Sequence, residues 1–200
     1  MRSATQYRSK SVGSVAQSRR MPGPSHSKPP LVAADLDRLA LRYVERFATT
    51  RARLAAYLTR KLRERGWEGE GPPDPMAVAE RMATRGYVDD RSFAEARVRS
   101  MGRRGLGGRR VEMALRHDGI DAEDSADLAE AIEADAFRNA IIFARRRRFG
   151  PFAATPADRD LRKKQVAAFL RAGHPPEIVH RILQMAPGEE PEDLPGAGHS

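Results

Sequence analysis

The sequence predicts an all-α protein of three tandem three-helix units, and three observations support this fold class. Alanine, leucine and arginine, which favour helices, dominate wherever glycine or proline does not interrupt the chain. Charged residues are 32% of the chain and aromatic residues 6%, which fits small helices better than one broad core. Similar helix ends recur at Gly66, Gly119 and Gly173, in steps of 53 and 54 residues. Such a period indicates repeated units that need neighbours to bury their faces.

We place the first unit at residues 34–88. Asp35 is expected to cap its first helix, whose apolar residues recur at helical spacing. Thr50 begins a second helix, which Gly66 ends. Asp74 and the following proline provide an N-cap and a first helical residue for the third helix, and Gly86 ends it.

The stretch GYVDDRSFA, residues 86–94, joins the first unit to the next and sets two aspartates side by side. A Mg²⁺ site or an acid–base pair would need further ligands, and adjacent helix residues do not face each other. We therefore expect Asp89 or Asp90 to cap the next helix. Tyr87 and Val88 are expected to pack at the seam between the units, and Phe93 to anchor the helix.

The second unit is placed at residues 89–134 and the third at 135–186. In the second unit, Gly107-Gly108 opens the middle helix and Asp121 caps the last one. In the third, Thr155 is expected to cap the middle helix through a T-x-x-D pattern with proline next to it. Pro175-Pro176 begins the final helix.

Both ends of the chain differ from the middle in composition. Residues 1–33 are Ser-, Gly-, Pro- and Arg-rich and are expected to form a disordered basic arm, with a transit peptide or a later natural start as alternatives. Residues 187–200 are expected to form a disordered acidic tail. Removing six positive charges of residues 1–30 and four negative charges of the tail from the net +9 leaves +7 on the middle. A polyanionic partner is the natural inference.

Two basic segments are candidate contact sites for nucleic acid or an acidic partner. The first, GRRGLGGRR, lets arginine side chains and the N–H groups of the next helix meet an anion together, although a solvated, close-packed turn is an equal alternative. The second is a run of four arginines, more than a helix C-terminus needs. The candidate residues are Arg103, Arg104, Arg109, Arg110, Arg145, Arg146, Arg147 and Arg148.

No motif indicates an enzyme, a metal site or a cofactor. The chain has no cysteine, its five histidines lack zinc spacing, and phosphate-loop, serine-elbow and dinucleotide motifs are absent from the sequence. No apolar run approaches the ~18 residues of a membrane span. We expect a soluble, non-enzymatic, cytoplasmic protein.

The arrangement resembles the RecX family of recombinase regulators, over roughly residues 36–185. Three tandem three-helix units are characteristic of that family. The resemblance rests on LAAYLTRKLRERG at 54–66, GYVDDRSFA at 86–94, Gly105-Leu106-Gly107 with Leu115 and Gly119-Ile120, and Lys164-Gln165 through Gly173 followed by Ile178 to Leu183. Arg53 stands where the family usually has an acid, and His174 where an aromatic residue is common.

The resemblance implies an elongated, curved array and a monomeric regulator in recombination, DNA repair and the SOS response. Such a protein binds the RecA recombinase, chiefly its filament on single-stranded DNA, and inhibits ATP hydrolysis and strand exchange. The alternative is a stand-alone helix-turn-helix-like DNA-binding protein, because three short helices can imitate that motif. Against it, no predicted helix gathers base-reading Asn, Gln and Arg side chains on one face.

Overall fold

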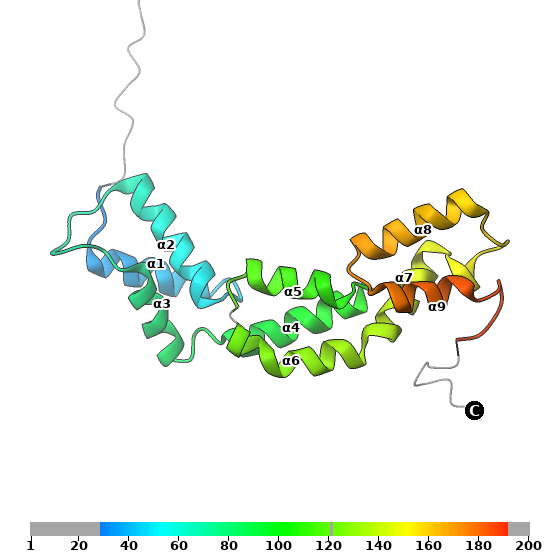
Figure 1. Ribbon diagram of the computed structural model, residues 1–200. Helices are drawn as coiled ribbons and strands as arrows, with labels where there is room; N and C mark the ends of the chain where they lie inside the picture. The colour runs from blue at the N-terminus through cyan, green and yellow to red at the C-terminus, as the bar shows by residue number, and fades with distance from the viewer. Residues whose placement is uncertain (1–28, 121, 192–200) are drawn as a thin grey trace, which may run out of the picture.

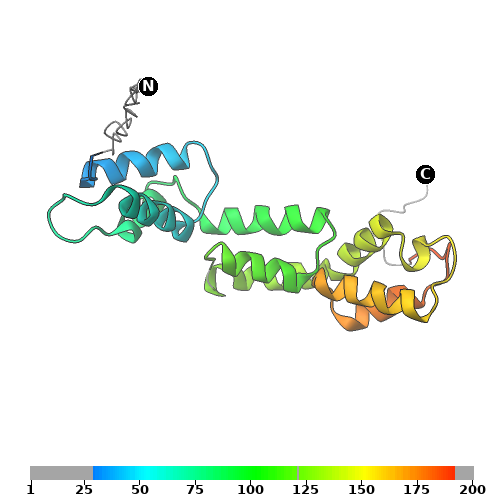
Figure 2. The ribbon, with the colours of Figure 1, turned by 90° about the horizontal axis from the view of Figure 1, so that it is seen from above.

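A computed structural model describes residues 29–120 and 122–191, and all of its regular elements are helices. The elements are α1 (Ala33–Val44), α2 (Arg51–Arg65), α3 (Pro75–Thr84), α4 (Asp90–Arg103), α5 (Gly108–His117), α6 (Ala122–Ala134), α7 (Ala136–Arg147), the 3₁₀ turn η1 (Gly150–Phe152), α8 (Arg159–Arg171) and α9 (Pro176–Gln184). Figures 1 and 2 show them as three groups in a row, forming an elongated array whose two ends rise in Figure 1. The predicted all-α, curved array is confirmed for the described residues.

Each group of three helices has its own apolar core. Leu54, Leu58 and Met82 belong to the first core, formed by α1–α3. A second core lies among α4–α6 and a third among α7–α9, and Leu106 packs against both. From these cores we propose unit boundaries at 34–88, 89–134 and 135–186.

Most predicted helix starts agree with the structure. Thr50 accepts a hydrogen bond from the Arg53 N–H, Asp74 from Ala77, and Asp89 from Ser92. Gly107 is the N-cap of α5 and Pro175 that of α9. The predicted cap Asp121 lies outside the described residues.

Two predicted caps are wrong. Asp35 is the third residue of α1, and its carboxylate accepts a hydrogen bond from the Val32 N–H, so the helix begins at Ala33. Helix α8 begins at Arg159 rather than beside Thr155, because Asp158 accepts a hydrogen bond from the Leu161 N–H at 2.7 Å. Aspartate is the better N-cap of the two residue types, which explains why the later start prevails.

A few described residues at the two ends of the chain contact the folded groups. Leu31 is fully buried against the first core. Its N–H donates to the Gly66 carbonyl at 3.0 Å, and its carbonyl accepts from the Glu68 N–H at 2.9 Å. At the other end, the Gly188 N–H donates to the Pro151 carbonyl at 2.9 Å. Residues 1–28 and 192–200 lie outside the described residues.

The middle helices of the three groups meet end to end, which explains two of the three recurring glycines, Gly119 and Gly173. The Asp118 carbonyl at the end of α5 accepts a hydrogen bond from the Thr50 hydroxyl, at 2.6 Å, at the start of α2. At the next joint, the Ala172 carbonyl at the end of α8 accepts from the Gly107 N–H at the start of α5, at 2.9 Å. Gly119 and Gly173 have φ angles of +77° and +91°, which glycine adopts readily. Each joint thus pairs the acceptor end of one helix with the donor end of another.

The two aspartates of GYVDDRSFA have separate structural roles. Asp89 caps α4, and its hydrogen bonds from the Ser92 N–H and hydroxyl hold the pKa of its carboxyl below the usual value. Asp90 is buried and accepts hydrogen bonds from Arg51 of the first group. Val88 is buried in the core of the first group. Tyr87 is 53% exposed, so the prediction that it fills the seam is wrong.

Candidate functional site

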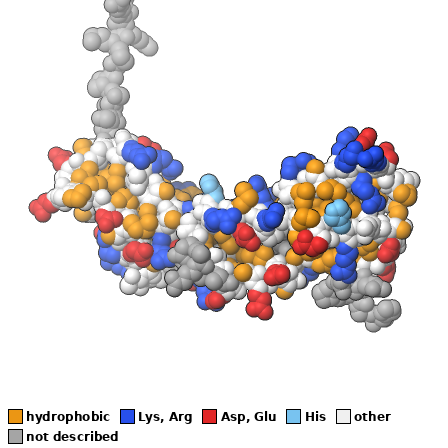
Figure 3. Space-filling model, viewed as in Figure 1, with side chains coloured by type: hydrophobic (Ala, Val, Ile, Leu, Met, Phe, Trp, Pro, Cys, Tyr) orange, Lys and Arg blue, Asp and Glu red, His pale blue; other side chains and the backbone are white. Residues whose placement is uncertain are grey.

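The eight candidate arginines lie at the ends of three helices, and all are exposed. Arg103 and Arg104 end α4, and Arg109 and Arg110 lie in the first turn of α5. The run 145–148 covers the last turn of α7 and its C-cap. Lys and Arg side chains also recur along the upper side of all three groups in Figure 3.

Helix α7 crosses the end of α4, and this crossing brings two of the arginine segments together. The guanidinium of Arg146 donates to the Arg104 carbonyl at 3.2 Å and to the Arg103 carbonyl at 3.0 Å. A cation at this position complements the negative end of the α4 dipole. The segments at 103–104 and 145–148 therefore share one surface, which we call the arginine seam.

Part of the run 145–148 stabilises the third group. The guanidinium of Arg145 lies 5.1 Å from the centre of the Phe152 ring, and that of Arg147 lies 5.6 Å from the centre of the Phe143 ring. Both distances are within the range of cation–π attraction, which leaves the charge itself accessible. Arg148 has a φ of +57°, and no other non-glycine residue among those described has a positive φ.

The start of α5 contradicts the expectation that its N–H groups take part in anion binding. The Gly107 N–H donates to the Ala172 carbonyl, and the Arg109 N–H donates to the Gly173 carbonyl at 3.3 Å. A carbon atom added at Gly107 would lie 2.4 Å from the Gly173 backbone, so no anion fits between them. The side chains of Arg109 and Arg110 are therefore the groups that remain accessible at this helix end.

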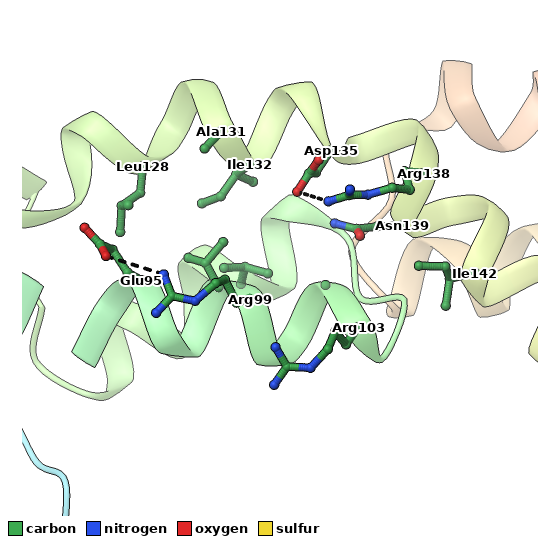
Figure 4. A pocket seen from close by; sticks show the side chains of 13 residues that line it. Glu95, Arg99, Arg103, Leu128, Ala131, Ile132, Asp135, Arg138, Asn139 and Ile142 are labelled. Atoms are coloured by element: carbon green, nitrogen blue, oxygen red, sulfur yellow. Dashed lines mark hydrogen bonds and ion pairs between the residues drawn. The ribbon is translucent and has the colours of Figure 1, made fainter. Parts of the chain in front are cut away.

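A groove of about 450 Å³ runs beside the arginine seam, between α4, α6 and α7 (Figure 4). Its apolar lining comes from Val98, Val111, Leu128, Ile132 and Ile142. Basic side chains surround this lining: Arg99 pairs with Glu95 at 3.4 Å, and Arg138 pairs with Asp135. Arg103 lines the groove as well as belonging to the seam. The arrangement suits an acidic partner segment that also carries apolar side chains.

Sequence reasoning did not identify Arg99 and Arg138 as site residues. Each has an acidic residue three or four positions before it, which resembles an ordinary pair on one helix face. Their place on one groove depends on how α4 and α7 cross.

His174 occupies the interior of the joint between the second and third groups. Its side chain is fully buried, and its ring lies 5.4 Å from the ring centres of both Phe143 and Phe169. Nε2 lies 3.1 Å from the Gly105 carbonyl and donates to it when the ring is neutral. Burial lowers the pKa of His174 to about 4. The histidine thus packs as an aromatic ring and adds one hydrogen bond.

Residues 29–120 and 122–191 contain neither a metal-binding cluster nor a membrane-spanning helix. No group of three or more His, Asp or Glu side chains there is placed to hold a metal ion. No helix in the same part of the chain is long and apolar enough to cross a bilayer.

Comparison with known proteins identifies relatives over most of the chain. A family model described as "RecX, second three-helix domain" matches residues 89–127. The protein named "Regulatory protein RecX" in Myxococcus xanthus is 30% identical over 163 residues, covering 76% of this chain and 86% of its own. The protein of the same name in Agrobacterium fabrum is 33% identical, covering 78% and 84%. That of Halorhodospira halophila is 34% identical, covering 78% and 90%.

Proposed function

The chain belongs to the RecX family of regulatory proteins, and from this membership we propose that it regulates the RecA recombinase. It binds the filament that RecA forms on single-stranded DNA and inhibits ATP hydrolysis and strand exchange. It acts as a non-enzymatic monomer in the cytoplasm, where its partner works. The arginine seam and Arg109 and Arg110 provide part of the contact.

The observation that best supports this proposal is the end-to-end joining of α2, α5 and α8. Hydrogen bonds at both joints fix the three groups into one long, curved body. Such a body spans more than one subunit of a helical filament, whereas a compact domain of one core contacts a smaller area. The exposed arginines then face either phosphates or acidic side chains of the filament.

Inhibition follows from linkage. A protein that binds one state of a filament more tightly than another shifts the filament toward that state. A protein that bridges neighbouring subunits holds them at a fixed spacing. ATP hydrolysis then slows if it needs that spacing to change. The groove between α4, α6 and α7 offers an apolar contact beside the arginine seam, which adds to the charge attraction.

Co-sedimentation tests this assignment. RecA filaments assembled on single-stranded DNA with a non-hydrolysable ATP analogue are pelleted with the chain present, and the bound fraction is measured. We expect the chain to pellet with the filament and to stay in solution when RecA is left out at physiological salt. Tight, sequence-specific binding to duplex DNA, with no binding to the filament, would instead identify a stand-alone DNA-binding protein.

A further inference from the structure

Two exposed aromatic side chains lie on one surface, outside the arginine seam. Phe47 is 51% exposed and Tyr87 is 53% exposed. Every other Phe, Tyr or Trp side chain among the described residues is less exposed. Phe47 lines a groove along α1 and α2, and Tyr87 lines a second groove beside α4. Arg53 lines both grooves and joins them into one surface.

We propose that this aromatic–arginine surface binds single-stranded nucleic acid directly, with bases stacking on Phe47 and Tyr87. The proposal goes beyond the regulation of the recombinase, because it requires no RecA. The surface is defined by Arg42, Tyr43, Arg46, Phe47, Arg53, Tyr57, Arg60, Tyr87, Phe93 and Arg97.

The first groove combines stacked rings with arginines. Tyr43 and Tyr57 stack with their ring centres 4.4 Å apart, and Phe47 lies 5.2 Å from Tyr43. The guanidinium of Arg46 lies 5.6 Å from the Phe47 ring centre, and that of Arg60 lies 5.5 Å from the Tyr57 ring centre. Tyr43 thus packs between Tyr57 and Phe47, and the Phe47 ring stays half exposed with the Arg46 guanidinium beside it.

The second groove repeats this chemistry on the other side of Arg53. Its guanidinium lies 5.6 Å from the Phe93 ring centre, and both residues line the groove with Tyr87. Asp118 is buried and pairs with Arg53 at 3.7 Å and with Arg97 at 3.2 Å, so it holds both guanidinium groups in place. Ser92 and Ser100 add hydroxyl groups that can bond phosphate or base.

The charges of the first groove favour a polyanion. Arg42, Arg46, Arg53 and Arg60 line this groove, with Glu45 as its acid. In the second groove, Asp89 and the buried Asp118 balance the charges of Arg53 and Arg97, so this groove contributes rings and hydroxyl groups rather than net charge. Alternating cations and rings are what nonspecific single-strand binding uses, because phosphates meet the cations while bases stack on the rings. A duplex hides its base faces, so exposed rings offer it little. An unpaired strand therefore fits this surface best.

The proposal is tested without RecA, by fluorescence anisotropy of a labelled oligothymidylate titrated with the purified chain. A length of roughly 20 nucleotides is sufficient, because one single-strand site covers fewer nucleotides than this. We expect the double variant Phe47→Ala/Tyr87→Ala to bind at least about tenfold more weakly, given roughly fivefold or more for each lost stacking contact. Phe47→Tyr/Tyr87→Phe keeps both rings and should bind like the wild type. Leu161→Ala/Leu170→Ala removes side chains that are 46% and 43% exposed on α8 and is the matched control.

Three results would overturn the proposal: no binding of oligothymidylate by the wild type, equal binding by the alanine variant, or equal loss in the α8 control. A folded alanine variant that keeps its oligothymidylate affinity but no longer pellets with the filament would assign the surface to a protein contact. A parallel titration with oligouridylate shows whether the chain distinguishes ribose from deoxyribose. Binding of either strand that depends on the Phe47 and Tyr87 rings supports the proposal. The oligothymidylate assay omits RecA, so its failure leaves the proposed regulatory function standing.

Discussion

The carboxylate of Asp90 accepts two hydrogen bonds from Arg51, one from the backbone N–H and one from Nε, each at 2.9 Å. Arg51 is the first residue of α2 and Asp90 the first residue of α4, so the contact links the first group of helices to the second. Arg51 also pairs with Glu80 of α3, at 3.5 Å. One buried carboxylate thus satisfies a free N–H of one helix and fixes the position of another.

This contact predicts unequal roles for the two adjacent aspartates. Asp90→Ala should lower the free energy of unfolding by about 2–3 kcal/mol, because it removes two hydrogen bonds to a buried charge. Asp89→Ala removes an exposed N-cap and should cost about 1 kcal/mol. Urea denaturation measures both values. Equal losses would contradict the separate roles described here.

Neither aspartate is expected to contact the recombinase. The double variant Asp89→Ala/Asp90→Ala should therefore inhibit RecA normally per folded molecule, at a temperature below its lowered midpoint of unfolding. Inhibition that disappears while the midpoint stays unchanged would show that the two side chains belong to the contact surface.

A matched pair of glycines tests the joint between α2 and α5. Gly86 and Gly119 have φ angles of +78° and +77°, so alanine should strain both backbones by a similar amount, about 1–2 kcal/mol. A carbon atom added at Gly86 meets nothing within 4 Å, whereas one added at Gly119 would lie 2.2 Å from Cβ of Ala52. Gly119→Ala should therefore be the more destabilising by about 1–3 kcal/mol.

The second substitution Ala52→Gly should recover part of the difference, because it removes the atom that the new side chain meets. Thermal unfolding of the two single variants and of Gly119→Ala/Ala52→Gly makes the comparison. If Gly86→Ala and Gly119→Ala cost the same, the end-to-end joint does not form as described.

His174 predicts a stability that falls in mild acid. Its pKa is about 4 in the folded chain and 6.5 ordinarily, so between these values the unfolded chain binds more protons than the folded one. Above about pH 6.5, neutral His174 makes its full contribution to the free energy of unfolding. This contribution is lost as the pH falls toward 4, and the loss is at most about 3 kcal/mol. Denaturation midpoints across this window measure the effect.

His174→Phe should flatten that pH dependence, because phenylalanine fits between Phe143 and Phe169 and does not titrate. It loses the hydrogen bond to the Gly105 carbonyl, so we expect about 1 kcal/mol less stability at neutral pH. The exposed His117 is the control, and His117→Gln should keep the slope of the wild type. An unchanged slope in His174→Phe would exclude His174 as its source.

The arginines of the candidate site divide into structural and contact residues. Arg146→Gln should lower stability by about 1 kcal/mol, because its two hydrogen bonds to the end of α4 are lost. Arg109→Gln/Arg110→Gln should change stability by less than about 0.5 kcal/mol, since both side chains are exposed. If they meet phosphates, the double variant should reduce the slope of log affinity against log salt by about 0.7 per contact. Co-sedimentation at several salt concentrations measures this slope.

Local signals in the sequence were sufficient for the helices but not for the surfaces. Thr50, Asp74 and Gly66 act within one helical turn, so their roles could be predicted from neighbouring residues. Leu31 is surrounded by Pro29, Pro30 and Val32 with no helical period, and its burial depends on Gly66 and Trp67 far along the chain. The same holds for Arg51 and Asp90.

The candidate surfaces depend on distant residues in the same way. Phe47 continues the helical spacing of the apolar residues of α1, yet it lies past the end of that helix and is exposed. Arg146 looked like one of four equivalent arginines until the crossing of α7 and α4 placed it on two carbonyls. Relative placement of the groups, rather than local pattern, determines which charges remain accessible.

The most direct test of the regulatory function is phosphate release by RecA on single-stranded DNA, titrated with this chain. We predict that the wild type lowers the rate and that a variant with glutamine at Arg103, Arg104, Arg109, Arg110 and residues 145–148, checked for folding, inhibits weakly and with a smaller dependence on salt. A rate unaffected by the wild type would contradict the regulation of RecA. Full inhibition with unchanged salt dependence in the variant would contradict the assignment of the arginines.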